Sequence, residues 1–172
     1  MKQTTKILTL GILFLFAFSM QLSAQKCKYD YDKKDPITGE ITKGNKFTIS
    51  APNWRMSFDR SGDTYFSELK LFCKGNAREI IRKGDVITFK LANNEIVTIT
   101  AIDDFLPVAN ANETGVWSQY DGKYSIDPIV LQKIAENPPI FVRMSIESKV
   151  YSEEVSAKNG KKIQEAARCI LL

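Results

Sequence analysis

Histidine is absent from this chain of 172 residues, and its absence excludes the commonest catalytic and metal-binding chemistry. Serine–histidine and cysteine–histidine nucleophilic sites cannot form within one such chain. Histidine-containing zinc sites are excluded too, and three scattered cysteines do not make a structural zinc site. Glycine-rich nucleotide-binding motifs and the G-x-S-x-G motif of hydrolases are also missing. The sequence therefore predicts no cofactor and no bound metal, and it favours a protein that is not an enzyme.

A strong charge of either sign is missing as well. The chain carries 24 basic and 20 acidic residues, a net charge of +4. An excess this small argues against nucleic acid or an anionic membrane surface as the partner. After the first 25 residues, no apolar segment approaches the roughly 20 residues that cross a bilayer.

Residues 1–25 have the pattern of a secretory signal peptide. Lys2 and Lys6 precede an apolar run over residues 7–20, and a signal peptidase could cut after Ala24 or Gln25. An uncleaved anchor is the alternative. A lipid anchor on Cys27 is disfavoured because lysine directly precedes it. We therefore expect an exported protein, periplasmic or extracellular, with a single domain over residues 26–172 that does not span the membrane after signal removal.

Three cysteines remain in the mature domain, Cys27, Cys73 and Cys169. Export to an oxidising compartment favours a disulfide, and the odd number leaves one thiol over. Cys27 and Cys169 stand at opposite ends of the domain, and domain termini often lie close together. We predict a Cys27–Cys169 disulfide with Cys73 free and buried; a Cys27–Cys73 bond, or none, are the alternatives.

Most of the chain alternates apolar and polar residues with the period of β-strands. Turns are predicted at residues 36–39 and 61–63, between strands. The clearest hairpin spans residues 83–102, with a two-residue turn at Asn93-Asn94 that places Leu91 opposite Ile96. That register makes both faces apolar, so the hairpin is expected to lie centrally and to be covered on both sides.

The second half of the chain adds two helices. A further hairpin turn is predicted at Asp121-Gly122, and Asp127 with Pro128 starts a helix at about 127–136. The unit over residues 124–146 could form a parallel crossover. Residues 159–171 have the spacing of a C-terminal helix. The predicted fold is α+β, mostly an antiparallel sheet built from hairpins, with these two helices.

Few residues suggest a functional site. Asp103, Asp104 and Glu113 lie in the longest predicted loop, where paired acids could catalyse glycoside hydrolysis, although sequence neighbours rarely face each other as such a pair must. Trp54 and Trp117 could form a ligand platform, but their strand-like spacing favours core packing. Asp103, Asp104 and Trp117 are retained as surface-binding candidates.

Two local motifs have simpler explanations. Asp30, Asp32 and Asp35 partly match a calcium loop, but Lys34 stands where a ligand is needed, so a solvated edge strand running into a turn is favoured. Residues 112–114 (NET) match a glycosylation acceptor, which matters only in a host that glycosylates.

Four segments, LSAQ, DPITGE, KGDVITFKLANNEIVTI and YSIDPIVLQKIAENPPIFVRM, together resemble small, functionally uncharacterised secreted proteins of Bacteroidota-type bacteria. The resemblance implies an exported, periplasmic protein and supplies no activity.

We therefore predict an exported, non-enzymatic binding or envelope-associated module, whose partner is an unknown envelope component or secreted protein. The alternatives are a histidine-free hydrolase that uses carboxylates on an envelope glycan, and an inhibitor of another secreted protein. Acids meeting across a concave pocket would favour the hydrolase, and a protruding rigid loop would favour the inhibitor.

Overall fold

The computed structural model describes residues 27–51, 53–112 and 115–172, so the predicted signal peptide lies outside the described residues. These residues form a mostly antiparallel sheet and two helices, and the predicted α+β class is confirmed at this level. The elements are β1 (Tyr31–Lys34), β2 (Ile41–Ser50), β3 (Trp54–Ser61), β4 (Thr64–Lys74), β5 (Val86–Leu91), β6 (Ile96–Ala101), β7 (Val108–Asn112), β8 (Gly115–Ser125), α2 (Pro128–Glu136), β9 (Pro139–Ile146), β10 (Lys149–Glu154) and α3 (Ala157–Leu171).

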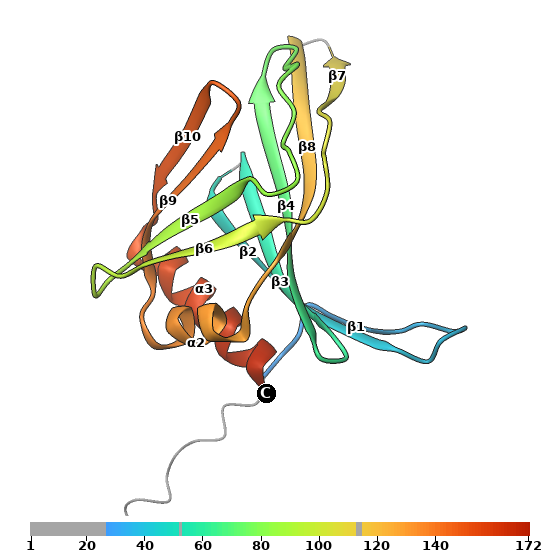
Figure 1. Cartoon of the computed structure of the whole chain (residues 1–172), viewed down its shortest axis with the longest axis vertical. Coiled ribbons are helices and arrows are strands. Elements are labelled where there is room, and N and C mark those ends of the chain that lie inside the picture. Colours follow the sequence, from blue (N-terminus) through green and yellow to red (C-terminus); the bar gives the residue numbers. More distant parts are fainter. Residues whose placement is uncertain (1–26, 52, 113–114) are drawn as a thin grey trace, which may run out of the picture.

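The strands follow the order β1-β2-β3-β4-β8-β6-β5-β9-β10, and β7 pairs with β8 beside this path. Every pairing is antiparallel. The free edge of β8 is shared, because β7 pairs along residues 115–119 while β6 pairs only with Tyr124 and Ser125. The sheet turns sharply at this short junction, so β5 and β6 cross in front of β2, β3 and β4, and β9 and β10 continue the sheet to the left (Figure 1).

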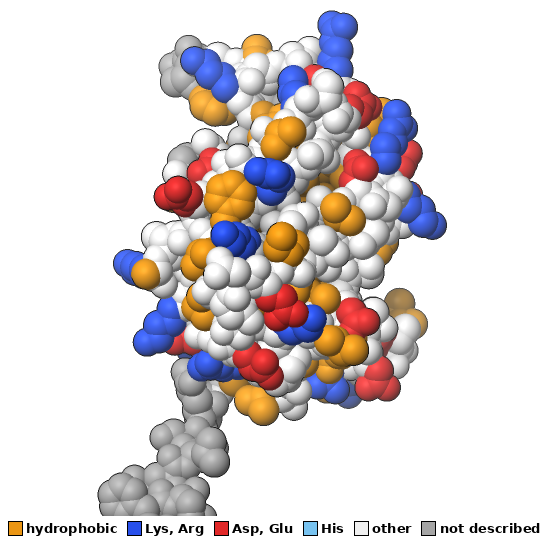
Figure 2. Space-filling view, turned by 60° about the vertical axis from the view of Figure 1, so that its left-hand side comes forward, with side chains coloured by type: hydrophobic (Ala, Val, Ile, Leu, Met, Phe, Trp, Pro, Cys, Tyr) orange, Lys and Arg blue, Asp and Glu red, His pale blue; other side chains and the backbone are white. Residues whose placement is uncertain are grey.

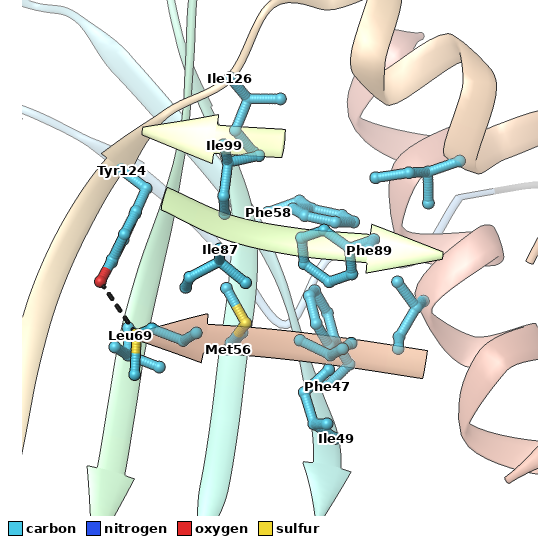
Figure 3. Close-up of a cluster of buried hydrophobic side chains, with 14 of the residues drawn as sticks. Phe47, Ile49, Met56, Phe58, Leu69, Ile87, Phe89, Ile99, Tyr124 and Ile126 are labelled. Carbon is cyan, nitrogen blue, oxygen red and sulfur yellow. Dashed lines mark hydrogen bonds between the residues drawn. The ribbon is translucent and has the colours of Figure 1, made fainter. Parts of the chain in front are cut away.

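The hydrophobic core lies between these two halves of the sheet. Figure 3 shows side chains from both halves meeting there, with Tyr124 donating a hydrogen bond of 3.4 Å to Met144 Sδ. The contributing residues include Phe47, Met56, Phe58, Leu69, Ile87, Phe89 and Ile99. They occupy alternate strand positions, so each strand contributes one face to the core and leaves the other outside.

The two helices close one end of the core (Figure 1). Helix α2 begins as predicted, with Asp127 accepting a hydrogen bond from the Ile129 amide at 2.7 Å and proline in the first turn. Helix α3 packs against α2, β2, β3 and β9. It approaches β9 closely at Gly160, where an added Cβ would lie 2.7 Å from the Pro139 carbonyl oxygen. Neither helix is long and apolar enough to cross a membrane.

The predicted disulfide joins Cys27 to Cys169, with the Cα atoms 5.3 Å apart. Tyr29 strengthens the same junction, since its hydroxyl donates a 3.0 Å hydrogen bond to the Cys169 carbonyl. The N-terminal segment is thereby attached to α3. Cys73 is free as predicted, although it is half-buried rather than buried.

The register predicted for the β5–β6 hairpin was wrong by one residue. Phe89 lies opposite Val97, and the loop holds three residues, Ala92 to Asn94. Asn94 does adopt the predicted left-handed conformation, with φ of 68°. A one-residue shift exchanges the two faces of β6, so Ile96 is exposed and Val97 is buried. The hairpin is interior as expected, but its two faces differ: one is core and the other is open to solvent.

Two further predictions failed at β8 and β9. Asp121-Gly122 forms no turn, because β8 runs through it and pairs along β4. The parallel crossover is also absent, since β9 pairs antiparallel with β5 and β10. In both cases long-range strand pairing decided the outcome, and a single window of sequence does not reveal which strands pair. The predicted long loop after Ala101 is also interrupted, by β7.

Candidate binding site

A large hollow lies on the outer face of the sheet, across β2, β3, β4 and β8. We call it the outer-face groove; it is an open concavity of about 610 Å³. The residues that line it are Lys46, Phe47, Thr48, Arg55, Met56, Ser57, Glu68, Leu69, Lys70, Phe105, Asp121, Gly122 and Lys123. The lining residues whose side chains point to the outer face alternate along each strand with residues that point into the core.

The strand pairing sets the outward side chains of the groove in rows. Thr48 lies opposite Arg55, Arg55 opposite Lys70, and Lys70 opposite Asp121. Two residues further along the same two strands, Lys46 lies opposite Ser57. Directly opposite side chains on one sheet face stand about 5 Å apart at Cβ. The groove is therefore a grid of closely spaced donors and acceptors on a rigid support.

The β4–β8 side of the groove carries a further pair of charged side chains, since Glu68 lies opposite Lys123. The Lys123 cation contacts an aromatic ring, with the ammonium nitrogen 3.7 Å from the centroid of Phe66. Lys70 forms an ion pair with Asp121 at 3.5 Å. Within the described ranges, no carboxylate lies within 4.0 Å of the charged groups of Lys46, Arg55 or Lys123. Cationic groups are thus in excess at the two sides of the groove.

A buried carboxylate adjoins the groove. Asp59 is 0% exposed although it lies on the outer face of β3, and it accepts hydrogen bonds from the hydroxyls of Ser57, at 2.5 Å, and Tyr31. Burial raises the pKa of Asp59, against the opposing effect of these two hydrogen bonds. Gly44, its partner on β2, leaves the space that this contact needs, because a methyl group there would overlap Asp59 and the Tyr31 ring.

Tyr31 covers this carboxylate from β1. Burial, and then the hydrogen bond to Asp59, raise the pKa of the tyrosine, so its hydroxyl remains a donor at neutral pH. The Lys46 ammonium lies 5.6 Å from the centroid of its ring. The hydrogen bond from Tyr31 to Asp59 attaches β1 to β3 beside the groove. Because Tyr31 covers Asp59, this carboxylate cannot contact a ligand directly.

Nothing in the sequence signals this arrangement. Ser57 and Asp59 alternate with core residues, which predicts solvent exposure, yet both are buried, with Tyr31 of β1 and Ser57 donating to Asp59. The groove-lining lysines and arginine are likewise ordinary polar alternates of their strands. These side chains line one groove because the sheet is concave here, and the alternation of polar and apolar residues does not predict the curvature of a sheet.

Asp103 and Asp104, which were predicted as binding candidates, form hydrogen bonds and an ion pair that stabilise their own loop. Asp104 accepts a 2.8 Å hydrogen bond from the Lys83 amide and pairs with Arg82 at 3.3 Å. The Lys83 hydrogen bond is the main reason why the pKa of Asp104 is lowered. Asp103 accepts a hydrogen bond from the Asp104 amide at 2.9 Å. The two carboxylates therefore stabilise the loop between β6 and β7 and do not face each other across a pocket.

The tryptophans also lie apart from the groove. Trp117 is half-buried on β8, opposite Lys74 of β4 on one side and Asn110 of β7 on the other. Trp54 is a core residue, as the favoured interpretation predicted. None of Asp103, Asp104 and Trp117 lines the outer-face groove.

The free thiol has the surroundings of an unreactive cysteine. Cys73 ends the core-facing pattern of β4, and burial raises its pKa. A reactive cysteine needs the opposite, an exposed thiol with a lowered pKa. The structure thus offers no thiolate nucleophile at Cys73.

The aspartates near the N-terminus follow the simpler explanation. β1 is an edge strand, and Asp35 accepts hydrogen bonds from the amides of Ile37, at 2.7 Å, and Thr38, at 2.8 Å. These bonds lower the pKa of Asp35 and fix the turn. Among the described residues, no cluster of three cysteines or acids could hold a metal ion. The acceptor motif at residues 112–114 falls largely outside the described ranges.

The opposite side of the molecule carries a second hollow of about 570 Å³. It is lined by Thr88, Lys90, Ile96, Ile140, Phe141, Arg143 and Glu154. Figure 2 brings the β9–β10 side forward and shows hydrophobic side chains scattered among basic and acidic ones, without a continuous apolar patch. Fewer charged groups converge here than in the outer-face groove.

Comparison with models of known protein families, with curated proteins and with solved structures finds no match for this chain.

Proposed function

We propose that this chain is an exported, non-enzymatic binding module that holds its ligand in the outer-face groove. The observation that carries the proposal is the groove itself: an open concavity on a rigid sheet, lined by charged side chains, with no ion-pair partner in the described ranges for Lys46, Arg55 or Lys123. Preorganised polar groups on a sheet bind without the entropic cost of ordering a loop.

Several features support export as part of this proposal. The signal-like segment over residues 1–25, the Cys27–Cys169 disulfide and the resemblance to secreted Bacteroidota-type proteins all fit an oxidising compartment outside the cytoplasm. The partner is then an envelope component or another secreted molecule.

The hydrolase alternative has less support. Such a reaction needs two carboxyl groups facing a substrate from opposite sides. Asp103 and Asp104 are turned into their own loop, and Asp59 is covered by Tyr31. Glu68 and Asp121 do line the groove, but Asp121 is held by Lys70.

Binding to the envelope tests the proposal. Mature protein is mixed with the envelope fraction of the producing cell and sedimented, and the bound fraction is compared between wild type, Arg55→Glu and Lys90→Glu. Lys90 is an exposed cation on β5, away from the groove, so it controls for net charge. We expect Arg55→Glu alone to release the protein. Equal binding by all three proteins would refute the groove as the binding site.

A second candidate, an inhibitor of another secreted protein, is favoured by the β1–β2 hairpin. Its tip projects from the body of the molecule (Figure 1) and presents Ile37, which is 92% exposed. The turn is held by Asp35 through the amides of Ile37 and Thr38. Ile37→Asp should then abolish capture of a secreted protein while leaving envelope sedimentation unchanged; if capture survives the substitution, this candidate is wrong.

A further inference from the structure

Two cations and one free hydroxyl lie close together at the β2–β3 side of the groove. Thr48 faces Arg55 and Lys46 faces Ser57, but the Ser57 hydroxyl is buried and donates to Asp59, so only the Thr48 hydroxyl accompanies the two cations. Both cations lack a carboxylate within 4.0 Å in the described part of the chain. Arginine binds a carboxylate or a phosphate through two parallel hydrogen bonds. With Glu68 and Asp121 in the same groove, a singly charged carboxylate meets less repulsion than a phosphate group that carries nearly two charges.

The rest of the groove is not uniformly basic. Glu68 and Asp121 place acceptors beside the donors Lys70 and Lys123. An acidic polymer without hydroxyl groups would meet repulsion from both acids and would have no hydroxyl to donate to them. A chain of hydroxyl groups would not be repelled, because each hydroxyl can both donate to a carboxylate and accept from an ammonium group.

The spacing of the cations also indicates how far the ligand extends. Lys46 lies on β2 and Lys123 on β8, three strands away across the same face. Neighbouring strands are about 4.8 Å apart, so the two strands are separated by roughly 14 Å. A ligand that reaches both cations therefore extends across the strands and carries well-separated negative charges.

From these observations we propose that the ligand of the groove is an acidic oligosaccharide, a sugar chain with one carboxylate at Lys46 and Arg55, a second at Lys123, and hydroxyls that bond to Glu68. This inference rests on the proposed function, and it names the ligand class of the same site. An acidic peptide is disfavoured by the two groove acids. Strand addition is also excluded at this face, because the backbone groups of β2, β3, β4 and β8 are already paired within the sheet.

Titration calorimetry with defined probes tests the inference. The probes are a trimer of galacturonic acid, its neutral methyl ester, polyglutamate and inorganic phosphate. The proteins are wild type, Arg55→Glu, Lys46→Glu and the matched control Lys90→Glu, each with its melting temperature measured. We expect the acidic trimer to bind wild type and Lys90→Glu equally. Loss of the charge-assisted contact should weaken binding roughly tenfold or more in the methyl ester and in either groove variant.

Other outcomes overturn the inference in different ways. Equal affinity for the methyl ester removes the carboxylate requirement, and tighter binding of polyglutamate identifies an acidic peptide instead. Phosphate that competes at the affinity of the trimer reduces the site to a simple anion site. If none of the probes binds while envelope sedimentation still depends on Arg55, the ligand class is wrong and the binding module stands. If sedimentation is also independent of Arg55, the proposed function fails as well.

Discussion

Alternate residues of the eight-residue strand β3 form its two faces, and the two faces differ in what stabilises them. The inner face places Trp54, Met56 and Phe58 in the core, where close packing fills the space. The outer face places Arg55 in an open groove and buries Asp59 under β1. Apolar burial on one side is enforced by the hydrophobic effect. On the outer face, the cost of burying the Asp59 carboxylate is offset by the hydrogen bonds that it accepts from Tyr31 and Ser57.

Removal of an inner-face ring should give the largest effect. Phe58 is 0% exposed, and its ring centroid lies 4.7 Å from that of Phe47. Phe58→Ala should lower the free energy of unfolding by about 3–5 kcal/mol, because it removes apolar burial and leaves a cavity. Urea denaturation measures this. A loss below about 1 kcal/mol would contradict the position of Phe58 at the centre of the core.

The disulfide ranks next. Cys27→Ser and Cys169→Ser should each cost about 2–5 kcal/mol, since either removes the same crosslink across 142 residues. The double variant should be little worse than either single one. Cys73→Ala is the control and should cost only a small packing term. Thiol labelling after denaturation without reductant should find one cysteine; three labelled thiols, or a peptide linking Cys27 to Cys73, would overturn the pairing.

The outer-face hydrogen bonds should contribute less than the core. Tyr31→Phe removes one donor from a buried carboxylate and should cost about 1–3 kcal/mol. If Tyr31 contributes nothing measurable in urea denaturation, the β1 hairpin is not held through Asp59. Ser57→Ala provides the parallel measurement on the second donor.

The pH dependence of the free energy of unfolding measures the contribution of Asp59 separately from that of the apolar core. The folded-state pKa of Asp59 is raised, so the folded protein holds this proton more tightly than the unfolded chain. The stability linked to Asp59 is therefore present below its unfolded pKa and is lost as the pH rises through its folded pKa. Relative to Asp59→Asn, wild type should lose stability over that range. Urea titrations at several pH values measure the difference, and a constant difference would contradict the raised pKa.

The smallest effects are expected at exposed positions. Asn94 has φ of 68°, so Asn94→Gly should be neutral or mildly stabilising, while Asn94→Val should cost on the order of 1 kcal/mol. Equal melting temperatures for the two variants would argue against the left-handed turn. Arg55→Glu, by contrast, should leave stability within about 0.5 kcal/mol of wild type and change binding alone.

Local sequence patterns determined much of this protein. Alternation placed Trp54 in the core, and Asp127-Pro128 marked the start of α2, because these features depend on strand pleat and helix capping alone. The terminal position of Cys27 and Cys169 was enough to predict their pairing. The absence of histidine limited the possible chemistry through composition alone.

Only the tertiary structure decided the rest, because it depends on which strands meet. Long-range pairing with β4 carried β8 straight through Asp121-Gly122, and one extra loop residue at the β5–β6 turn exchanged Ile96 for Val97 in the core. The bend at the β8–β6 junction brought the two halves of the sheet together. The groove and the burial of Asp59 arise in the same way, since side chains from four strands and a covering hairpin become neighbours only after the sheet has formed.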